Sequence, residues 1–493
     1  MQTQVSEWRA TPFLDPRSDD PVYLQIAQAL MREIHDGRFG PGESLPGYRR
    51  LAEQLGVSRN TVMAAYAELR AEGWVVSTPG EGSAVSARLP AHLPGRGPPQ
   101  GAASIAPGPA IGFDLAGAAP STPPHPAGRL LEVASGLPDP RLLPGAALAR
   151  AYRRALTPAR ASARAADPQG HPRLREALAH LLARGRGIPG SAEDVLVTRG
   201  TQMALFLVAQ ALFTPGDAVA VEAMGGRGAW EAFARAGARC LPVPVDEAGL
   251  RVEELEPVLR AGGLRAVLVT PQRQYPTLAI LSPERRARLL ALARRHRFAV
   301  IEIDQDSEFQ FDGRALAPLA AGEAPGLVVH LGTLSKIFSP DLRLGFVHAP
   351  APLIARMREL RATFDRHGDP VLERAMAELM EDGEIQRHLN RMVQVYRRRR
   401  DALCAALARE LPAAVSVQPP AGGLALWVGV QHGIDVDRWA ARALERGVAF
   451  QPGRRFAFDG GPVAGMRLGF SGYPEPQLED VASRLRAALE EAP

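Results

Sequence analysis

Residues 328–346, VVHLGTLSKIFSPDLRLGF, join a short apolar run to a loop that carries Lys336. The run Val328–Leu331 predicts a buried strand. Lys336 is the single lysine among 58 basic residues, and all the others are arginines. Arginine can replace lysine where only charge matters, but not where a neutral, nucleophilic amine is needed, because its guanidinium stays protonated. The one remaining lysine is therefore a candidate for chemistry.

Four more short apolar runs, separated by helical stretches, predict an α/β domain with a largely buried sheet. They are Val195–Thr198, Ala218–Glu222, Ala266–Thr270 and Ala299–Ile303. The first meets Arg199-Gly200-Thr201-Gln202 at the start of an apolar helix, where free N–H groups and the helix dipole favour a phosphate. A lysine beside Thr, Ser and Arg side chains after such a strand fits the Schiff-base amine of a pyridoxal phosphate site.

Composition places the chain among globular proteins. With 493 residues, 46% apolar and 23% charged, it is long enough for roughly two to four domains. Met1–Asp20 lacks an apolar core, so we expect no signal peptide, and no apolar run is long enough to span a bilayer. The 2 cysteines, Cys240 and Cys404, have no metal-ligand spacing and cannot form a disulfide framework. This favours a reducing, cytoplasmic compartment and no metal site.

Three regions with different composition predict the domain organisation. Residues 1–88 are dense in helical periodicity, residues 89–130 are rich in Pro, Gly and Ala, and residues 131–493 alternate helices with short apolar strands. The middle region has no periodic apolar positions to bury, so we interpret it as a linker. In the last region we expect a large part to about residue 365 and a smaller C-terminal part after it.

The first region has the pattern of a winged helix-turn-helix, an α+β fold. Val22, Ile26, Leu30 and Ile34 recur at helical spacing, and Leu51 and Leu55 are expected to face inward from a second helix. Ser58 is a plausible N-cap after the turn at Gly56-Val57. The expected elements are helices over 21–36, 47–55 and 59–72, followed by a hairpin formed by 74–76 and 84–86 around 78–82.

The third expected helix begins Ser58-Arg59-Asn60-Thr61, side chains that suit phosphates and base edges in a major groove. Residues 1–87 hold eight arginines and eleven acids, so the support is the local cluster of Arg49, Arg50 and Arg59. A bare helix-turn-helix also serves protein interactions. The stretch Leu45–Val75, however, resembles the GntR-type winged helix over its whole length, except at Gly47-Tyr48. The resemblance implies that double-stranded DNA is contacted by Arg49, Ser58, Arg59, Asn60, Thr61 and the Gly80–Gly82 wing.

The whole chain resembles the MocR-type regulators, in which a GntR winged helix is fused to a fold-type-I aminotransferase-like domain. The segments that carry this resemblance are TPQRQYPT (270–277), EIDQDSEFQFDGR (302–314), GTLSKIFSPDLRLGF (332–346), FDRHGDPVLERAMAELMEDGEIQRHLNRM (364–392) and RLGFS (467–471). It implies that Lys336 forms the Schiff base with pyridoxal phosphate and that Arg467 binds a substrate or effector carboxylate. It also implies a phosphate site made of Thr201, Gln202, Thr333 and Arg343.

The sequence departs from the family within the cofactor pocket. Ile303 takes the position of the carboxylate that pairs with the pyridine nitrogen, and Gln305 that of the tyrosine bonded to the phenolic oxygen. Gly226 and Ala165 replace two further tyrosines, the first of which stacks on the ring, and Arg273 replaces a histidine. Loss of the carboxylate weakens both binding and the electron-sink chemistry of the cofactor. Asp304 or Asp306 compensates only if the strand register shifts by one residue, which would also reverse the faces of the neighbouring side chains. Of the two, Asp304 is the expected cofactor-binding carboxylate.

Three interpretations stay open at this level. The first is a transcriptional regulator whose aminotransferase-like domain dimerises and senses an amine or amino acid through pyridoxal phosphate. The second is a regulator whose domain has lost the cofactor and senses another ligand or only dimerises. The third is a true aminotransferase with an appended DNA-binding domain, which the losses in the pocket make less favourable. In the regulator, ligand chemistry at Lys336 and Arg467 would change domain closure and with it the spacing of two DNA readers.

Overall fold

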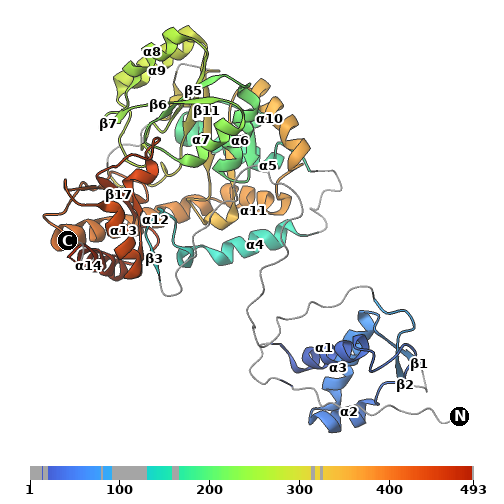
Figure 1. The fold of residues 1–493 in the computed structure, drawn as a ribbon. Helices are drawn as coiled ribbons and strands as arrows, with labels where there is room; N and C mark the ends of the chain where they lie inside the picture. The colour runs from blue at the N-terminus through green and yellow to red at the C-terminus, as the bar shows by residue number, and fades with distance from the viewer. Residues whose placement is uncertain are drawn as a thin grey trace, which may run out of the picture. The chain divides into compact units, whose positions relative to one another are not determined.

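The chain forms two compact units, residues 1–122 and 123–493, in the computed structural model (Figure 1). The structure describes residues 14, 20–78, 82–90, 130–157, 166–312, 317–322 and 326–490. Apart from its ends, the linker expected over 89–130 lies outside these residues, and so do Gly80, Glu81 and Ala165.

The first unit is a winged helix-turn-helix, as predicted. Its elements are α1 (Val22–His35), α2 (Tyr48–Leu55), α3 (Arg59–Ala71), β1 (Val75–Thr78) and β2 (Gly82–Val85). The two strands pair antiparallel and form the wing. Gly56 ends α2 in the left-handed conformation, with φ of 62°, which a residue without a Cβ adopts at little cost. The turn between α2 and α3 therefore depends on this glycine.

The core of this unit lies between α1, α2 and α3. Ile26, Leu30 and Ile34 are buried on α1, as their spacing predicted. Leu51 is buried, and the partly buried Leu55 packs against the same core, as expected. Val22, in contrast, is 43% exposed, so its expected place on the buried stripe is wrong. Val22 is the first residue of α1, and the buried stripe starts one turn later, at Ile26.

The second unit contains a seven-stranded sheet in the order β4-β12-β11-β10-β9-β5-β6. Its strands are β4 (Val195–Thr198), β5 (Ala218–Glu222), β6 (Arg239–Val243), β9 (Leu264–Val269), β10 (Ala299–Ile303), β11 (Val328–Thr333) and β12 (Gly345–His348). All neighbouring pairs are parallel except those of β12, which runs antiparallel to both β11 and β4. The five strands expected from the sequence are all present.

Helices cover both faces of this sheet, which explains why its strands are continuously apolar. On one face α6 (Thr201–Leu212), α7 (Arg227–Arg235) and α10 (Ala351–Phe364) pack on Val219, Leu268, Ile301 and Leu331. On the other, α8 (Leu255–Ala261) and α9 (Pro283–His296) pack on Ala220, Val267 and Val300. Alternate residues of each strand face opposite layers, so both layers must be apolar.

A smaller antiparallel sheet, β13-β14-β17-β16, follows in the C-terminal part. Its strands are β13 (Val415–Val417), β14 (Ala425–Val430), β16 (Gln451–Pro452) and β17 (Gly465–Gly469). The remaining helices are α4 (Gly145–Ala155), α5 (Pro172–Leu181), α11 (Pro370–Glu381), α12 (Glu384–Glu410), α13 (Val436–Glu445) and α14 (Glu475–Glu490). Short two-stranded pairs join β3 (Leu131–Glu132) to β15 (Val448–Ala449) and β7 (Val245–Asp246) to β8 (Gly249–Leu250). Among the described residues, no helix has the length and apolar character needed to cross a membrane.

Candidate functional site

The start of α3 is held by its own polar side chains. Ser58 is the N-cap, and its hydroxyl accepts a hydrogen bond from the backbone N–H of Thr61 at 3.1 Å. The Ser58 and Thr61 hydroxyls also lie 2.8 Å apart. This cap satisfies one of the free N–H groups at the helix N-terminus. Part of the hydrogen-bonding capacity of both hydroxyls is therefore used inside the unit.

Three of the residues expected to meet DNA point outward. Arg49, Arg59 and Asn60 are exposed, and none of them makes a side-chain hydrogen bond or ion pair within the described part of the chain. Gly82 starts β2 with φ of 92°, and a Cβ at this position would meet no atom within 4 Å. Among the described residues, nothing therefore blocks a close approach to the backbone of Gly82.

Tyr48, where the sequence departs from the GntR pattern, has a structural role. Its ring packs edge-on against Tyr66 with centroids 5.1 Å apart, and its hydroxyl lies 3.2 Å from that of Ser83. Arg70 donates hydrogen bonds to the hydroxyls of Tyr48 and Ser77, at 3.3 and 3.1 Å. These contacts tie α2, α3 and the wing together.

A cavity of about 240 Å³ lies at the carboxyl ends of the strands in the second unit. Lys336 enters it from the loop after β11, Thr201 and Gln202 from the start of α6, and Arg467 from β17 of the small sheet. The topology thus brings together residues that are far apart in the sequence. The carboxyl edge of an open α/β sheet is the usual place for a ligand.

The amine of Lys336 is held by backbone. Its Nζ donates a hydrogen bond to the carbonyl oxygen of Gly136 at 2.7 Å. Burial and, to a smaller extent, the positive charge of Arg467 lower the pKa of this amine, Asp306 acts in the opposite direction, and the resulting pKa is about 8. A substantial fraction of the amine is therefore neutral, and hence nucleophilic, close to physiological pH.

The residues expected to bind phosphate gather around the start of α6. Thr201 and Gln202 line the cavity. Arg343 donates to the carbonyl oxygen of Arg199 at 3.2 Å, and its guanidinium lies 3.8 Å from the Cβ that Gly200 would carry. Thr333 does not line the cavity. Its hydroxyl donates to Leu344 O at 3.1 Å, in the turn that shapes the lysine loop.

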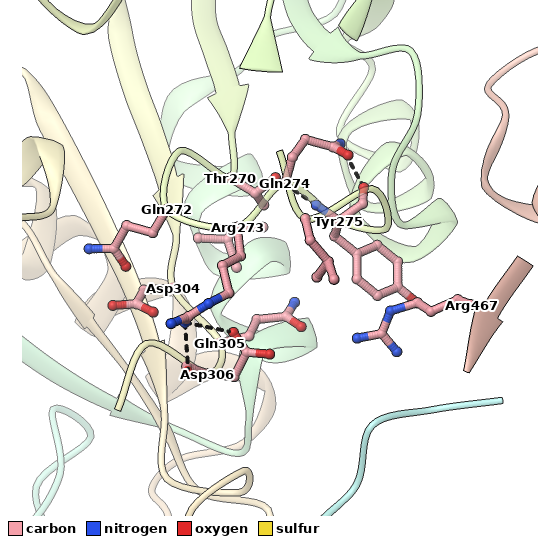
Figure 2. A pocket seen from close by; sticks show the side chains of 11 residues that line it. Thr270, Gln272, Arg273, Gln274, Tyr275, Asp304, Gln305, Asp306 and Arg467 are labelled. Atoms are coloured by element: carbon pink, nitrogen blue, oxygen red, sulfur yellow. Dashed lines mark hydrogen bonds and ion pairs between the residues drawn. The ribbon is translucent and has the colours of Figure 1, made fainter. Parts of the chain in front are cut away.

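Asp304 does not take the place of the missing carboxylate. Ile303 pairs with Leu331 in the β10–β11 register, so Ile303 lines the cavity and Asp304 is directed elsewhere. The Asp304 carboxylate forms an ion pair with Arg186 and accepts a hydrogen bond from the Ser307 hydroxyl. In Figure 2, Asp304 lies beside Gln272 and away from Arg467. The expectation that Asp304 joins the Lys336 cavity is therefore corrected.

The departures from the family shape the cavity wall. Ile303, Gln305 and Gly226 all line it, so an apolar side chain, an amide and a bare backbone occupy these three positions. Arg273 lies in the adjacent crevice shown in Figure 2. It donates to the backbone oxygens of Asp306 and Phe309, at 3.0 and 3.3 Å, and so joins two loops.

Arg467 is a buried cation, with only 3% of its surface exposed. Its guanidinium carbon lies 4.9 Å from the centre of the Tyr275 ring. Figure 2 shows the two side chains next to each other. Its Nε is buried and has no hydrogen-bond partner among the residues that the structure describes. A buried guanidinium without a carboxylate is costly, and a planar anion such as a ligand carboxylate would satisfy it.

Two groups of site residues were not expected from the sequence. Glu222, the last residue of β5, lines the cavity and accepts hydrogen bonds from the hydroxyl and backbone N–H of Thr270, at 2.6 and 3.2 Å. Burial raises its pKa to about 7. The sequence signal that could have pointed to it is a glutamate at the end of an otherwise apolar strand, AVAVE. Gln274 donates to the carbonyl oxygens of Met224 and Tyr275, at 2.6 and 2.7 Å, and so ties the backbone of these two loops together.

Comparison with known families matches both units. Residues 22–85 match the model described as "Bacterial regulatory proteins, gntR family". Residues 137–485 match the model "Aminotransferase class I and II". The two matches fall on the winged helix and on the unit that holds the Lys336 cavity.

Curated relatives and solved structures agree with these matches. The chain is 30% identical to the probable rhizopine catabolism regulatory protein MocR of Rhizobium meliloti, over 97% of this chain and 95% of the relative. It is 33% identical to the transcriptional regulator TauR of Rhodobacter capsulatus, over 90% and 91%. The structure of kynurenine aminotransferase from Pyrococcus horikoshii superposes with a TM-score of 0.68 and 29% identity, over 74% of this chain and 92% of that one.

Proposed function

Because this chain belongs to the MocR-type transcriptional regulators, with a GntR-family DNA-binding domain joined to a class I and II aminotransferase domain, we propose that it regulates transcription in response to a small amine or amino acid bound beside Lys336. The observation that carries this proposal is that the only lysine of the chain lines the same cavity as Arg467. A nucleophilic amine and a carboxylate-binding cation together suit such an effector.

The residues of the cavity fit pyridoxal phosphate at two of its three recognition points. Lys336 would hold its aldehyde carbon, and Thr201, Gln202 and Arg343, at the α6 N-terminus, would hold its phosphate. At the third point Ile303 offers no carboxylate to the pyridine nitrogen. When bound, the cofactor supplies a reactive carbonyl and an electron sink. With Ile303 in place of a carboxylate, the cavity suits the reactive carbonyl of the cofactor but not its action as an electron sink. We therefore assign the domain to sensing rather than to physiological transamination.

Signal transfer to DNA requires that the effector favour one arrangement of the protein over another. Lys336 comes from the large sheet and Arg467 from the small one, so a ligand held by both draws the two parts together. In a cytoplasmic homodimer, this closure would alter the spacing of two winged helices on their half-sites. Arg49, Ser58, Arg59, Asn60, Thr61 and Gly82 would form the DNA-contacting surface of each.

The absorbance spectrum of the purified full chain tests the cofactor. We expect a band near roughly 420 nm from the lysine-bound cofactor, absent from Lys336→Ala. A spectrum without this band, unrestored by added pyridoxal phosphate and equal in both proteins, would contradict the cofactor assignment. Release of keto acid on repeated turnover with amino donors would instead favour an aminotransferase.

The regulatory part is tested separately, with DNA selected from a random library by the full chain. Amines and amino acids that shift the thermal transition of the second unit should also change DNA affinity or the preferred half-site spacing. Lys336→Ala and Arg467→Gln should lose this response while still binding DNA. A ligand that binds without changing either property would overturn the closure mechanism.

A further inference from the structure

The first inference rests on the proposed function and concerns an opening in the wall of the Lys336 cavity. Three glycines line this cavity. A Cβ at Gly225 would lie 3.1 Å from the Trp230 ring, and one at Gly228 would lie 2.4 Å from the Gln202 side chain. At Gly226 the nearest atom is 4.0 Å away, on the ring of Tyr275. Of these three, only Gly226 faces free space.

The free space has aromatic neighbours. The Tyr275 ring borders Gly226, and the Trp230 indole lies directly behind Gly225. Both rings are held in place from outside the cavity, Tyr275 by Phe456 at 5.4 Å and Trp230 by Phe458 at 5.0 Å between ring centres. Fixed aromatic walls favour a flat apolar group, because ring–ring contacts add to the burial of apolar surface.

The same tyrosine connects this space to the carboxylate site. The Arg467 guanidinium lies over the face of Tyr275, while Gly226 borders its edge. The two positions are thus separated by about the width of one ring. A ligand whose carboxylate binds Arg467 reaches the space at Gly226 with its side chain.

We propose that the cavity is selective for an aromatic carboxylate, an amino acid or the corresponding 2-oxo acid, whose ring occupies the space beside Gly226 between Tyr275 and Trp230. The backbone of Gly226 is extended, with φ of −90° and ψ of 116°. Any L-residue adopts this conformation without strain. A larger side chain can therefore fill the space from the protein side, which makes the proposal directly testable.

The experiment compares full-length wild type, Gly226→Tyr and Gly226→Ala by calorimetric titration. The probes are phenylalanine and phenylpyruvate against alanine and pyruvate, so that the amino and oxo arms are separated. In wild type we expect the aromatic member of at least one pair to bind tenfold or more tightly than the aliphatic one, on the order of the gain from burying a ring. Gly226→Tyr should abolish this preference by bringing the aromatic affinity down to the level of the aliphatic one measured in the same variant, whereas Gly226→Ala should keep the preference.

The remaining outcomes contradict either the aromatic selectivity or the amino-acid effector itself. Equal affinity for aromatic and aliphatic acids in wild type, or an unchanged preference in Gly226→Tyr, overturns the aromatic selectivity and leaves sensing at Lys336 intact. If none of the four acids binds, with or without added cofactor, both the selectivity and the amino-acid effector fail. A thermal melt of each variant confirms that the second unit is folded.

A second inference comes independently from the DNA-binding unit. Met63 on α3 is 40% exposed. It follows Arg59 by four residues and Asn60 by three, so the three side chains lie on one face of the helix. This outward face carries cationic and amide groups at the first turn and the Met63 thioether one turn later. We infer that Met63 reads the 5-methyl group of a thymine in the major groove, the apolar feature that distinguishes this base.

Replacing single thymines by deoxyuridine tests this inference, because only the methyl group is removed. The probe is the DNA selected by the full chain from a random library. For wild type we expect one thymine in each half-site whose replacement weakens binding by about three- to tenfold, equivalent to about 0.7 to 1.4 kcal/mol. In Met63→Ala the same replacement should have no effect. Val22→Ala, a change at an apolar residue of similar exposure on α1 (43%), should behave as wild type. The inference is wrong if every thymine responds equally in wild type and Met63→Ala.

Discussion

The buried charge of Lys336 should destabilise the cofactor-free protein, and Lys336→Met should relieve this cost. Burial, together with the charge of Arg467, lowers the pKa of the amine from 10.5 to about 8. One pKa unit corresponds to about 1.4 kcal/mol, so the full effect is about 3 kcal/mol. The side chain is only partly buried and solvent screens part of the charge, so we expect a gain of about 1 to 3 kcal/mol at pH 7. Methionine keeps the apolar stem and removes the cation.

The pH dependence has a definite sign. Between about pH 8 and 10.5 the unfolded chain binds more protons at this lysine than the folded chain does, so the free energy of unfolding of wild type rises with pH. Below pH 8 both states are protonated and the cost is present in full. Lys336→Met has no such group and should lose the rise. Lys336→Arg keeps a cation that does not deprotonate in this pH range. It should therefore show neither the rise of the free energy of unfolding with pH nor the gain in stability expected for Lys336→Met at pH 7.

Calorimetric melting of the cofactor-free protein at pH 7 and pH 9.5 measures both effects. Unfolding entropy is about 2.1 cal/mol/K per residue, which for the unit of residues 123–493 converts the expected gain to a rise of about 1 to 4 °C in Tm. The transition of the smaller unit, residues 1–122, serves as an internal reference. Identical transitions of wild type and Lys336→Met at both pH values would refute the buried-cation argument.

Four further predictions concern other residues. Arg59→Ala should weaken binding to the selected DNA and reduce the slope of log K against log salt by about 1, as expected for one lost phosphate contact; an unchanged slope would place Arg59 away from the backbone. Ser58→Ala should lower the free energy of unfolding of the winged helix, measured with urea, by about 1 kcal/mol, because the Ser58 hydroxyl caps α3. Ser58→Asn should retain most of this stability, because asparagine is also a good N-cap. Glu222→Gln should remove a fall in stability between about pH 4.5 and 7, since the folded carboxyl keeps its proton to about pH 7 and the unfolded one does not; melts at pH 5 and 8 check the sign. Ile303→Asp should cost the cofactor-free protein about 1 to 3 kcal/mol by burying a carboxyl group, and pyridoxal phosphate should restore more of its thermal stability than in wild type, a difference that thermal shift measures.

The winged helix was the part most open to prediction because its signals are local. Helical spacing at Ile26, Leu30 and Ile34 and the cap at Ser58 act within one or two turns, and the structure has them where the sequence placed them. Val22 was misjudged, since spacing alone does not say where a neighbouring helix stops covering α1. The strands of the large sheet were predictable for the same reason, because burial on both faces requires a continuous apolar run.

The direction of side chains at the Lys336 cavity depended on the tertiary structure. Asp304 and Ile303 are neighbours in sequence, and the sequence alone does not say which of the two faces the cavity. The β10–β11 register directs Ile303 into the cavity, and Asp304 forms an ion pair with Arg186. Glu222, Tyr275 and Gly226 reach the cavity only because parallel strands end at one edge of the sheet. No periodicity within a single segment contains that information.

By itself the sequence singled out one lysine as the candidate for chemistry in this protein, because every other basic residue is an arginine, which cannot supply a neutral amine. It also determined the order of a DNA reader followed by an α/β domain. Only the tertiary structure decided what surrounds that amine: a cavity that lowers its pKa, a buried guanidinium from another sheet, an isoleucine where a carboxylate would stand, and an open space at Gly226. The physical reason is that desolvation and charge–charge interactions act through space, between groups that the chain brings together only when it folds.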